Sequence, residues 1–483
     1  MTFGPTPFRS LWQMPCATVL ALAVAACASF TNDGGMTPVA QHVAVSLGKE
    51  TAKIASLADA EHVRDRVTTL LARPLTADSA VQIALINNRG LQAEYNALGI
   101  SEAAYVEASL PPNPVVSVGR MVAAGELEIE RRLVANLLSL FSLPARSAVA
   151  KTQFEAARLR AVEATFRLAA ETRRAYYRAV ASREKIGFLE KARQSVDAAT
   201  DLTIKLGETG AATRLDQTRA SAFYAETSNQ LAEARLQAAL DRENLTRRMG
   251  LWGSDIDYRL PPRLPDLPAR LPQQERLEAE AMRTRVDLIA ARMELDAQAR
   301  ALRLTDATRF VSMLELAGIS NETRKVEGAV TEINHPRGFE LEIQVPIFDG
   351  GEAGVRKSQE TYMQAVNQLA EKAVNARSEV RASFLAYRGT YDIARQFRDR
   401  IVPMRESISE QAVLEYNGML IDVFDLLTTV RESIASNIAA IDAKRAFFLA
   451  SIDVQAALIG GGAPAAEDAK GTAMTAAAES GGH

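Results

Sequence analysis

Cysteine, histidine and aromatic residues are scarce in this chain of 483 residues, which holds two Cys, four His and 6% aromatic side chains. The two cysteines both lie near the N-terminus and the histidines are scattered, so we expect neither a disulfide framework nor a metal-ligand cluster. The chain also lacks a phosphate-binding glycine loop and the turn that carries a nucleophilic serine. These gaps argue against an enzyme and against a bound metal or cofactor.

Strong net charge and long apolar runs are missing as well. The formal net charge is −3, so no basic field points to nucleic acid. Beyond the N-terminal segment no stretch approaches 18 consecutive apolar residues, so we expect no transmembrane helix. Charged residues make up 24% of the chain and alanine is frequent, which suits long packed helices.

The first 26 residues have the pattern of a secretory signal. Arg9 precedes a short apolar run, Ala17–Ala26, that ends in small residues. The segment Val24-Ala25-Ala26 followed by Cys27 resembles a bacterial lipoprotein box, which implies cleavage before Cys27 and a covalent lipid on it, the only non-protein group we expect. The alternative is an ordinary signal with a chance cysteine. The residues that follow Cys27 in this chain resemble those that direct bacterial lipoproteins to the outer membrane.

Residues 27–74 are weakly patterned and are predicted to form a lipidated, extended tether with a short helix around Glu61–Ala72. Thr76 then suits the N-cap of a helix that continues to about Ala108. Residues from 461 to 483 are predicted to be a flexible tail.

Strict alternation marks the segment Phe339–Ile347, where apolar residues alternate with Glu340, Glu342, Gln344 and a proline. A strand with one apolar and one polar face fits a membrane-spanning barrel strand, and without further strands the edge of a soluble sheet would be the preferred interpretation. Three further segments are predicted to be strands: Pro114–Met121, Leu127–Leu133 and Phe310–Ile319.

The same plan occurs twice along the chain, in residues 75–265 and 266–460. Residues 281, 288 and 290 repeat residues 84, 91 and 93 at an offset of 197, and residues 379, 381, 384 and 418 follow residues 171, 173, 176 and 210 at an offset of 208. The two offsets differ by 11 residues, which we assign to a longer loop between Asn321 and Arg337 because loops tolerate insertions.

A very long helix is predicted from Gly351 to Glu415, about 95 Å at 1.5 Å per residue. Val366, Ala373, Val380, Tyr387 and Ala394 recur every seven residues, which is coiled-coil spacing. Four strands cannot close a lipid-embedded barrel alone, so the membrane interpretation requires several chains. Three chains would supply about twelve strands, but this reasoning does not fix the number.

Three segments carry a resemblance to the TolC family of outer-membrane efflux channels: Pro74-Leu75-Thr76, the junction Val345–Gly351, and the run from Tyr416 to Leu426. The resemblance covers residues 61–460. It implies a mainly α fold with membrane β-structure, in which long coiled-coil helices form an α-barrel and four strands per chain join a shared β-barrel of a homotrimer. It also implies docking to a periplasmic adaptor protein and an inner-membrane pump.

The resemblance implies an outer-membrane location, with contacts to outer-membrane lipids and helices that extend into the periplasm. The implied function is passive export of small molecules or metal ions from the periplasm or the pump. Leu137–Ser147 and Tyr416–Leu420 look most like members associated with copper and heavy-metal efflux. The competing hypothesis is a periplasmic coiled-coil lipoprotein or adaptor that forms no pore.

The resemblance also suggests site residues. Asp422 and Asp425 would ring the narrow periplasmic end of the pore, although acids at a helix start also satisfy the helix dipole. Tyr416 and Arg214 are candidates for holding that end closed, with packing or surface roles as the alternative. The remaining candidates are the linker glycines Gly210 and Gly418, and the strand–helix joint formed by Pro346, Asp349, Gly350 and Gly351 and, in the first repeat, by Pro144.

Overall fold

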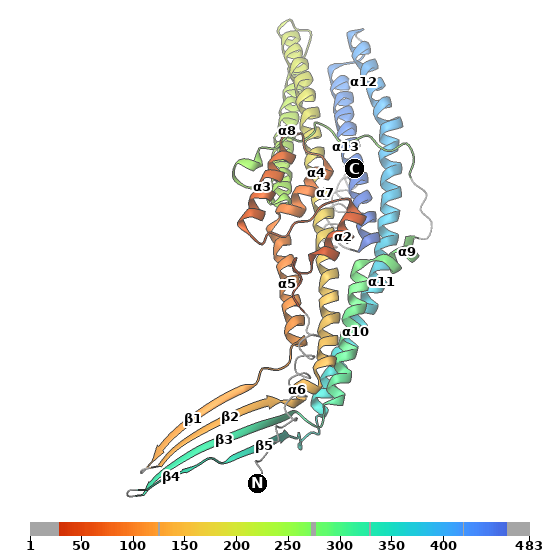
Figure 1. Cartoon of the computed structure of the whole chain (residues 1–483). Coiled ribbons are helices and arrows are strands. Elements are labelled where there is room, and N and C mark those ends of the chain that lie inside the picture. The colour runs from red at the N-terminus through yellow and green to blue at the C-terminus, as the bar shows by residue number, and fades with distance from the viewer. Residues whose placement is uncertain (1–28, 124–125, 272–276, 328–329, 419, 461–483) are drawn as a thin grey trace, which may run out of the picture. The chain divides into compact units, whose positions relative to one another are not determined.

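The computed structural model describes residues 29–123, 126–271, 277–327, 330–418 and 420–460 (Figure 1). Two compact units divide the chain. Of the described residues, the first holds Ala97–Arg158, Ala290–Ala370 and those up to Gly35, and the second holds Met36–Asn96, Leu159–Ile289 and those from Glu371 to Gly460. The signal segment, Cys27 and the predicted tail lie outside the described residues.

Long helices and one antiparallel sheet make up the described chain, which confirms the mainly α fold predicted from the sequence. Two helices, a set of strands, a long helix and a further helix follow one another, and this order then recurs. The first pass consists of α4 (Ala77–Asn87), α5 (Arg89–Ser109), β1 (Val115–Ala123), β2 (Glu126–Asn136), α6 (Leu137–Phe141), α7 (Leu143–Glu208), α8 (Arg214–Met249) and the short η1 (Gly253–Ile256). The second consists of α9 (Leu277–Thr284), α10 (Val286–Ala307), β3 (Met313–Glu327), β4 (Val330–Asn334), β5 (Arg337–Gln344), α11 (Glu352–Gln396), η2 (Phe397–Ile401), α12 (Val402–Asn417) and α13 (Val423–Ile459).

The sheet lies in the first unit, where β1, β2 and β3 are neighbours and β4 and β5 follow each other along the far side of β3 (Figure 1). The loop predicted for Asn321–Arg337 is therefore wrong. β3 continues to Glu327, and β4 pairs with its distal half. His335 and Pro336 interrupt the partner strand, and the Pro336 carbonyl still accepts the Asn321 N–H at 3.0 Å. The extra residues of the second repeat thus lengthen a hairpin.

The segment before α4 is docked in the second unit, where an extended tether was predicted. It contains α2 (Met36–Leu47) and α3 (Leu57–Leu71), and α3 starts four residues before the predicted helix because Ser56 forms a capping box at its N-terminus. Between these helices, the carboxamide of Gln82 pairs with both backbone groups of Glu50, at 3.1 and 3.0 Å. Gln92 likewise accepts the Ile54 N–H and donates to the Ala52 carbonyl.

Asn88 separates α4 from α5, where one continuous helix was predicted. Its backbone is extended (ψ 119°), and its side-chain oxygen caps α5 by accepting the Leu91 N–H at 3.0 Å. The side-chain nitrogen donates to the carbonyl of Arg248 at 2.9 Å, near the end of α8. One carboxamide therefore breaks the helix and anchors the end of another.

Arg285 occupies the corresponding place between α9 and α10. Its guanidinium donates to both oxygens of Asp287 (3.0 and 2.8 Å), to Glu379 (2.9 Å) and to the carbonyl of Ala457 (3.0 Å) near the end of α13. Burial by itself would lower the pKa of Arg285. The hydrogen bonds and charges of Asp287 and Glu379 outweigh this effect, so the pKa of Arg285 is raised. Gly460 has φ +80°, and a Cβ there would overlap the Asp287 carboxylate.

The predicted long helix is present as α11 and α12, with the π-helical turn η2 between them. Pro403 lies in the first turn of α12 and cannot donate a backbone hydrogen bond, and its ring would collide with the carbonyl four residues earlier in an α-helix. The wider π turn immediately before it accommodates that missing bond without ending the helix.

Candidate functional site

The sheet has two chemically different faces. Directly paired residues on neighbouring strands point to the same side, and successive residues alternate. The pairs Leu133–Gly318 and Gly318–Phe339 therefore belong to one face, and the pairs that include Ala317 belong to the other. In the single chain β1 and β5 are exposed on both faces, and the residues of β2 and β3 between them are mostly half-buried.

We call one side the acidic face. If β3 is followed only as far as Lys325, the charged residues on this side are seven carboxylates and two cations. They are Glu126, Glu128, Glu130, Arg132, Glu315, Lys325, Glu332, Glu340 and Glu342. Arg132 pairs with Glu340 at 3.0 Å, and Lys325 with Glu126 at 3.6 Å. Arg132 also reaches Glu342 at 4.0 Å, and Lys325 lies opposite Glu332 in the strand register, so seven carboxylates share two cations on the described part of this face.

We call the other side the apolar face. Its large apolar members are Val116, Val118, Val122, Leu127, Ile129, Leu133, Leu314, Leu316, Ile333, Phe339, Leu341 and Ile343. Phe339 is 83% exposed and Val118 is 69% exposed, so nothing in the described part of the chain covers these residues. A contiguous exposed apolar patch of this kind marks an interface with a partner or a membrane.

The joint between β5 and α11 depends on its two glycines. Gly350 and Gly351 have φ of +58° and +75°, in the left-handed region that favours glycine. A Cβ on Gly351 would overlap the backbone carbonyl of Arg309, so no other residue fits without moving the chain. The Asp349 carboxylate accepts the N–H of Gly351 at 3.0 Å, and the Pro346 carbonyl accepts that of Gly350 at 2.9 Å.

The corresponding joint of the first repeat is built differently from our prediction. β2 leads first into α6, whose N-cap Asn136 accepts the Ser139 N–H at 2.8 Å. Pro144 follows as the second residue of α7, where a proline costs no helical hydrogen bond. The prediction that Pro144 makes the strand–helix turn is therefore wrong; α6 makes it, and Pro144 starts the long helix.

The two linker glycines also differ. Gly210, between α7 and α8, has φ +78°, whereas Gly418, after α12, has φ −83°. Asp422 is the N-cap of α13, with its carboxylate accepting the N–H of Asp425 at 2.8 Å, and both aspartates are exposed. Asp422 therefore has a structural role in the single chain, while Asp425 keeps its carboxylate free of any hydrogen bond among the described residues.

Arg214 and Tyr416 are not joined to each other by any hydrogen bond among the described residues. Two cation–π contacts instead connect α8, which begins at Arg214, with α13, which follows Tyr416. The guanidinium of Arg219 in α8 lies 4.5 Å from the ring centre of Phe424 in α13. In return Arg431 of α13 lies 5.1 Å from the ring centre of Phe223 in α8.

Arg431 also pairs with Glu226 at 2.8 Å, so α8 and α13 are held by a reciprocal clasp of two cation–π contacts and one ion pair. Sequence reasoning missed this clasp. Its only local signal is an Arg and a Phe four residues apart in α8, which is common on any helix.

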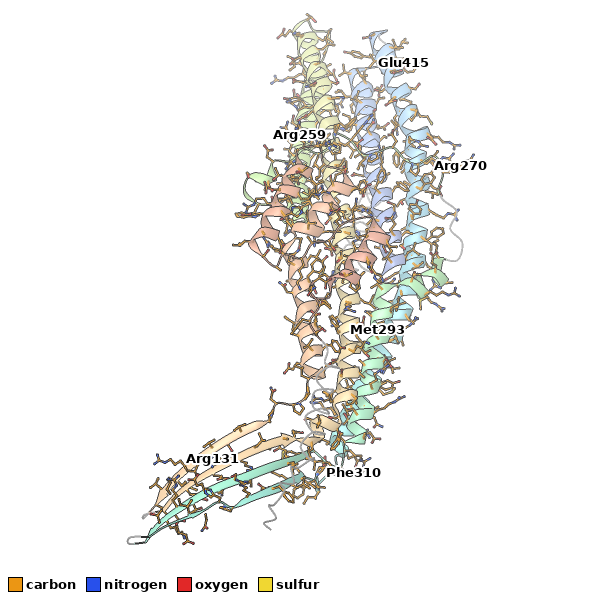
Figure 2. The ribbon with its side chains drawn as sticks, in the orientation of Figure 1. Arg131, Arg259, Arg270, Met293, Phe310 and Glu415 are labelled. Atoms are coloured by element: carbon orange, nitrogen blue, oxygen red, sulfur yellow. The ribbon has the colours of Figure 1, made fainter. Side chains whose placement is uncertain are left out.

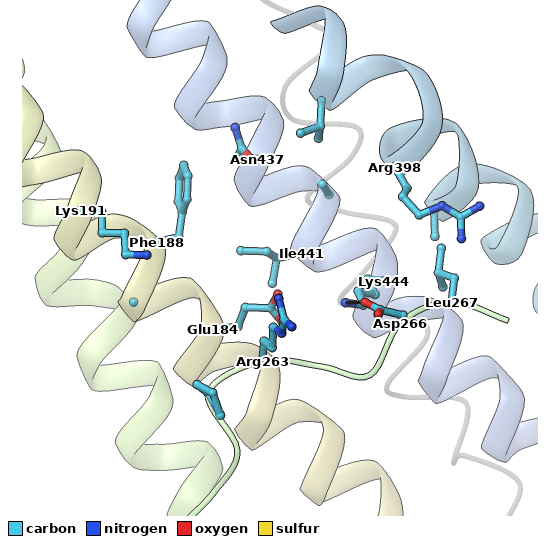
Figure 3. Close-up of a pocket in the computed structure, with 15 residues that line it drawn as sticks. Glu184, Phe188, Lys191, Arg263, Asp266, Leu267, Arg398, Asn437, Ile441 and Lys444 are labelled. Carbon is cyan, nitrogen blue, oxygen red and sulfur yellow. Dashed lines mark ion pairs between the residues drawn. The ribbon is translucent and has the colours of Figure 1, made fainter. Parts of the chain in front are cut away.

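A cavity of about 640 Å³ lies in the second unit beside the linker between the repeats (Figure 3). Glu184 accepts the Leu264 N–H at 2.7 Å, and Lys444 donates to the Leu264 carbonyl at 3.1 Å. Lys444 also approaches Asp266 at 3.8 Å. These contacts strap the proline-rich linker onto α7 and α13, which gives the cavity residues a structural explanation.

Within the described ranges, no three His, Cys, Asp or Glu side chains converge as metal ligands. Over the same ranges, no helix is both long and apolar enough to cross a membrane.

Comparison with known proteins places the fold. No protein-family model matches the chain, and no curated protein matches its sequence. Solved structures do match. The outer-membrane channel OprN superposes with a TM-score of 0.69 at 19% identity over 87% of this chain and 96% of its own. CusC, described for transmembrane channel formation, gives 0.64 at 17% over 82% and 92%. The MtrE outer membrane channel of Neisseria gonorrhoeae gives 0.61 at 17% over 80% and 90%. The chain therefore has the fold of these outer-membrane channels, as its resemblance to the TolC family predicts.

Proposed function

We propose that this protein is the outer-membrane channel of a tripartite efflux system and acts as a passive trimeric duct. The observation that carries this proposal is the sheet, which has one exposed apolar face, one acidic face and two unpaired edges. Lipid on one side and water on the other is the environment that such a sheet requires. The likeness to solved outer-membrane channels supports the same conclusion.

The open edges are the reason that several chains must combine. β1 is one edge of the sheet, and β4 with β5 is the other. Unpaired strand edges are not tolerated in hydrocarbon, so these edges must pair with those of other copies until the sheet closes. The TolC resemblance supplies the number, a homotrimer with twelve strands. The long helices would then extend into the periplasm toward an adaptor protein and an inner-membrane pump.

The charges indicate a duct that favours cations. The acidic face would line the barrel, and threefold repetition would multiply its excess of carboxylates. Asp422 and Asp425 would add a second acidic ring at the periplasmic end. Small cationic compounds and metal ions both suit such a lining, in agreement with the resemblance to heavy-metal efflux members. The clasp between Arg219 and Phe424 and between Arg431 and Phe223 would set how far the helical hairpins separate at that end.

A covalent lipid on Cys27 would anchor the N-terminus at the same membrane. Thr31, four residues later, donates to the Glu102 carboxylate through both its N–H (2.8 Å) and its hydroxyl (2.6 Å). The chain is thus fixed to α5 shortly after the anchor, which keeps the lipid near the unit that contains the sheet.

Reconstitution tests the proposal. Protein extracted in detergent should have the mass of a trimer and should produce step-like conductance with cation preference in planar bilayers. A monomeric mass without conductance would instead support the periplasmic adaptor and overturn the duct.

A further inference from the structure

Four arginines interrupt the apolar face in the half of the sheet nearer the turns that join β1 to β2 and β3 to β4. Arg120 of β1, Arg131 of β2, Arg324 of β3 and Arg337 of β5 all belong to this face by strand register. They fall in three successive rows of paired residues, and Arg131 stands beside Ser320, which in turn faces Arg337. The only acid among them is Glu322.

Glu322 orders two of these arginines. It accepts from Arg131 at 3.3 Å and pairs with Arg324 at 2.6 Å, and its side chain is only 12% exposed because the two guanidinium groups cover it. Arg131 and Arg324 each remain about half exposed. Arg120 and Arg337 are exposed and have no carboxylate partner in the described part of the chain. Four cations therefore share one anion.

The position of this cluster along the strands is specific. Figure 2 shows Arg131 out on the sheet, away from Phe310, which lies where the chain enters β3. From Val345 to Arg337 the chain advances eight residues, about 26 Å along a strand. The apolar residues between them match the height of the lipid-facing band of an outer-membrane barrel, about 25 Å. Arginine on that band is costly at the bilayer centre and tolerated at the interface.

We propose that the four arginines bind the phosphate groups of the phosphorylated glycolipid in the outer leaflet. The inference rests on the proposed outer-membrane barrel, since it needs the apolar face to meet lipid. The planar guanidinium fork matches phosphate in a bidentate manner, and Glu322 keeps two forks in place before the lipid arrives. Closure of the barrel would place Arg120 on β1 near the β5 edge of the neighbouring copy, so that the cluster repeats around the circumference.

The test compares two charge-matched variants of the full-length protein purified in detergent. Arg120→Gln with Arg337→Gln removes two cations from the apolar face and leaves both Glu322 pairs intact. Arg132→Gln with Lys325→Gln removes two cations from the acidic face. Binding of fluorescent diphosphoryl lipid A is titrated at physiological salt. We expect the first variant to bind about 30-fold more weakly, because each basic residue near an anionic headgroup contributes roughly a factor of five. The second variant should bind like the unaltered protein.

Equal binding by the first variant, or equal loss in both, would overturn the proposal. So would equally tight binding of dephosphorylated lipid A, or full displacement by millimolar inorganic phosphate, which would indicate a general anion site. A change in trimer mass in the first variant alone would show that the arginines serve the contact between copies instead. Conductance of the unaltered protein is recorded in parallel. A conducting trimer that ignores lipid A refutes only the lipid site, whereas a monomer without conductance refutes the duct and the lipid site with it.

Discussion

Replacing Arg285 by Met should loosen the carboxyl end of α13. The Arg285 side chain is 6% exposed, and its guanidinium donates to both oxygens of Asp287, to Glu379 and to the Ala457 carbonyl. Methionine fills similar space but leaves two carboxylates and a carbonyl without their partner. Removing one member of a buried ion pair costs about 3–5 kcal/mol. Arg285→Lys should give an intermediate effect, because an ammonium keeps the charge but cannot make the bidentate contact.

Hydrogen exchange of the amides in the last two turns of α13 measures this directly. A local loss of about 3 kcal/mol corresponds to exchange on the order of 100-fold faster. The control is Arg300→Met, which removes an exposed ion pair (2.9 Å) with Asp296, one turn earlier in the same helix. We expect it to change the exchange rates of the α13 amides less than about threefold. Exchange in Arg285→Met within threefold of the unaltered protein would refute the argument that the joint holds α13.

The remaining predictions concern charge and the anchor. Asp422→Asn with Asp425→Asn should reduce cation selectivity in planar bilayers without unfolding α13, since asparagine caps a helix as well as aspartate; unchanged reversal potentials would exclude the pore ring. Radioactive palmitate should label the protein but not Cys27→Ala, and label retained there would disprove the anchor. Burial raises the pKa of Glu163, above an ordinary value of 4.5, despite nearby Lys372. The folded chain therefore holds that proton more tightly, and stability falls as pH rises above about 4.5. Glu163→Gln should raise the unfolding temperature at neutral pH and barely change it at pH about 4; an equal effect at both would contradict this origin.

How much the sequence predicts depends on whether an element has a regular apolar pattern. The alternation in Phe339–Ile347 predicted a strand there and the chemistry of both its faces. The distal half of β3 escaped prediction because its residues, such as Glu322 and Arg324, are polar on both faces. Pairing with β2 and β4 and the ion pairs between side chains make that stretch a strand, and such partners lie far away in the sequence.

The candidate site shows the same division. Gly350 and Gly351 could be singled out because adjacent glycines signal an unusual backbone, and the structure places both in the left-handed region. The anchor at Arg285 could not be found, because its partner Ala457 is 172 residues distant and the matching position of the first repeat is Asn88. Two side chains of different chemistry make the same kind of joint, so comparison of the repeats does not reveal it.

The π turn η2 has a consequence for the hairpin end of α12. Tyr387 and Ala394 follow the seven-residue repeat, and its next members would be residues 401, 408 and 415. Ile401 and Val402 are both half-buried, and further along the less exposed residues are Ser409 and Tyr416, each one position later than the repeat requires. One residue is therefore absorbed in η2, and the heptad frame downstream is offset by about 100° of helix rotation. The direction in which Tyr416 points is set by this turn, about four helical turns away, and deleting one residue from η2 would rotate all of α12 that follows it.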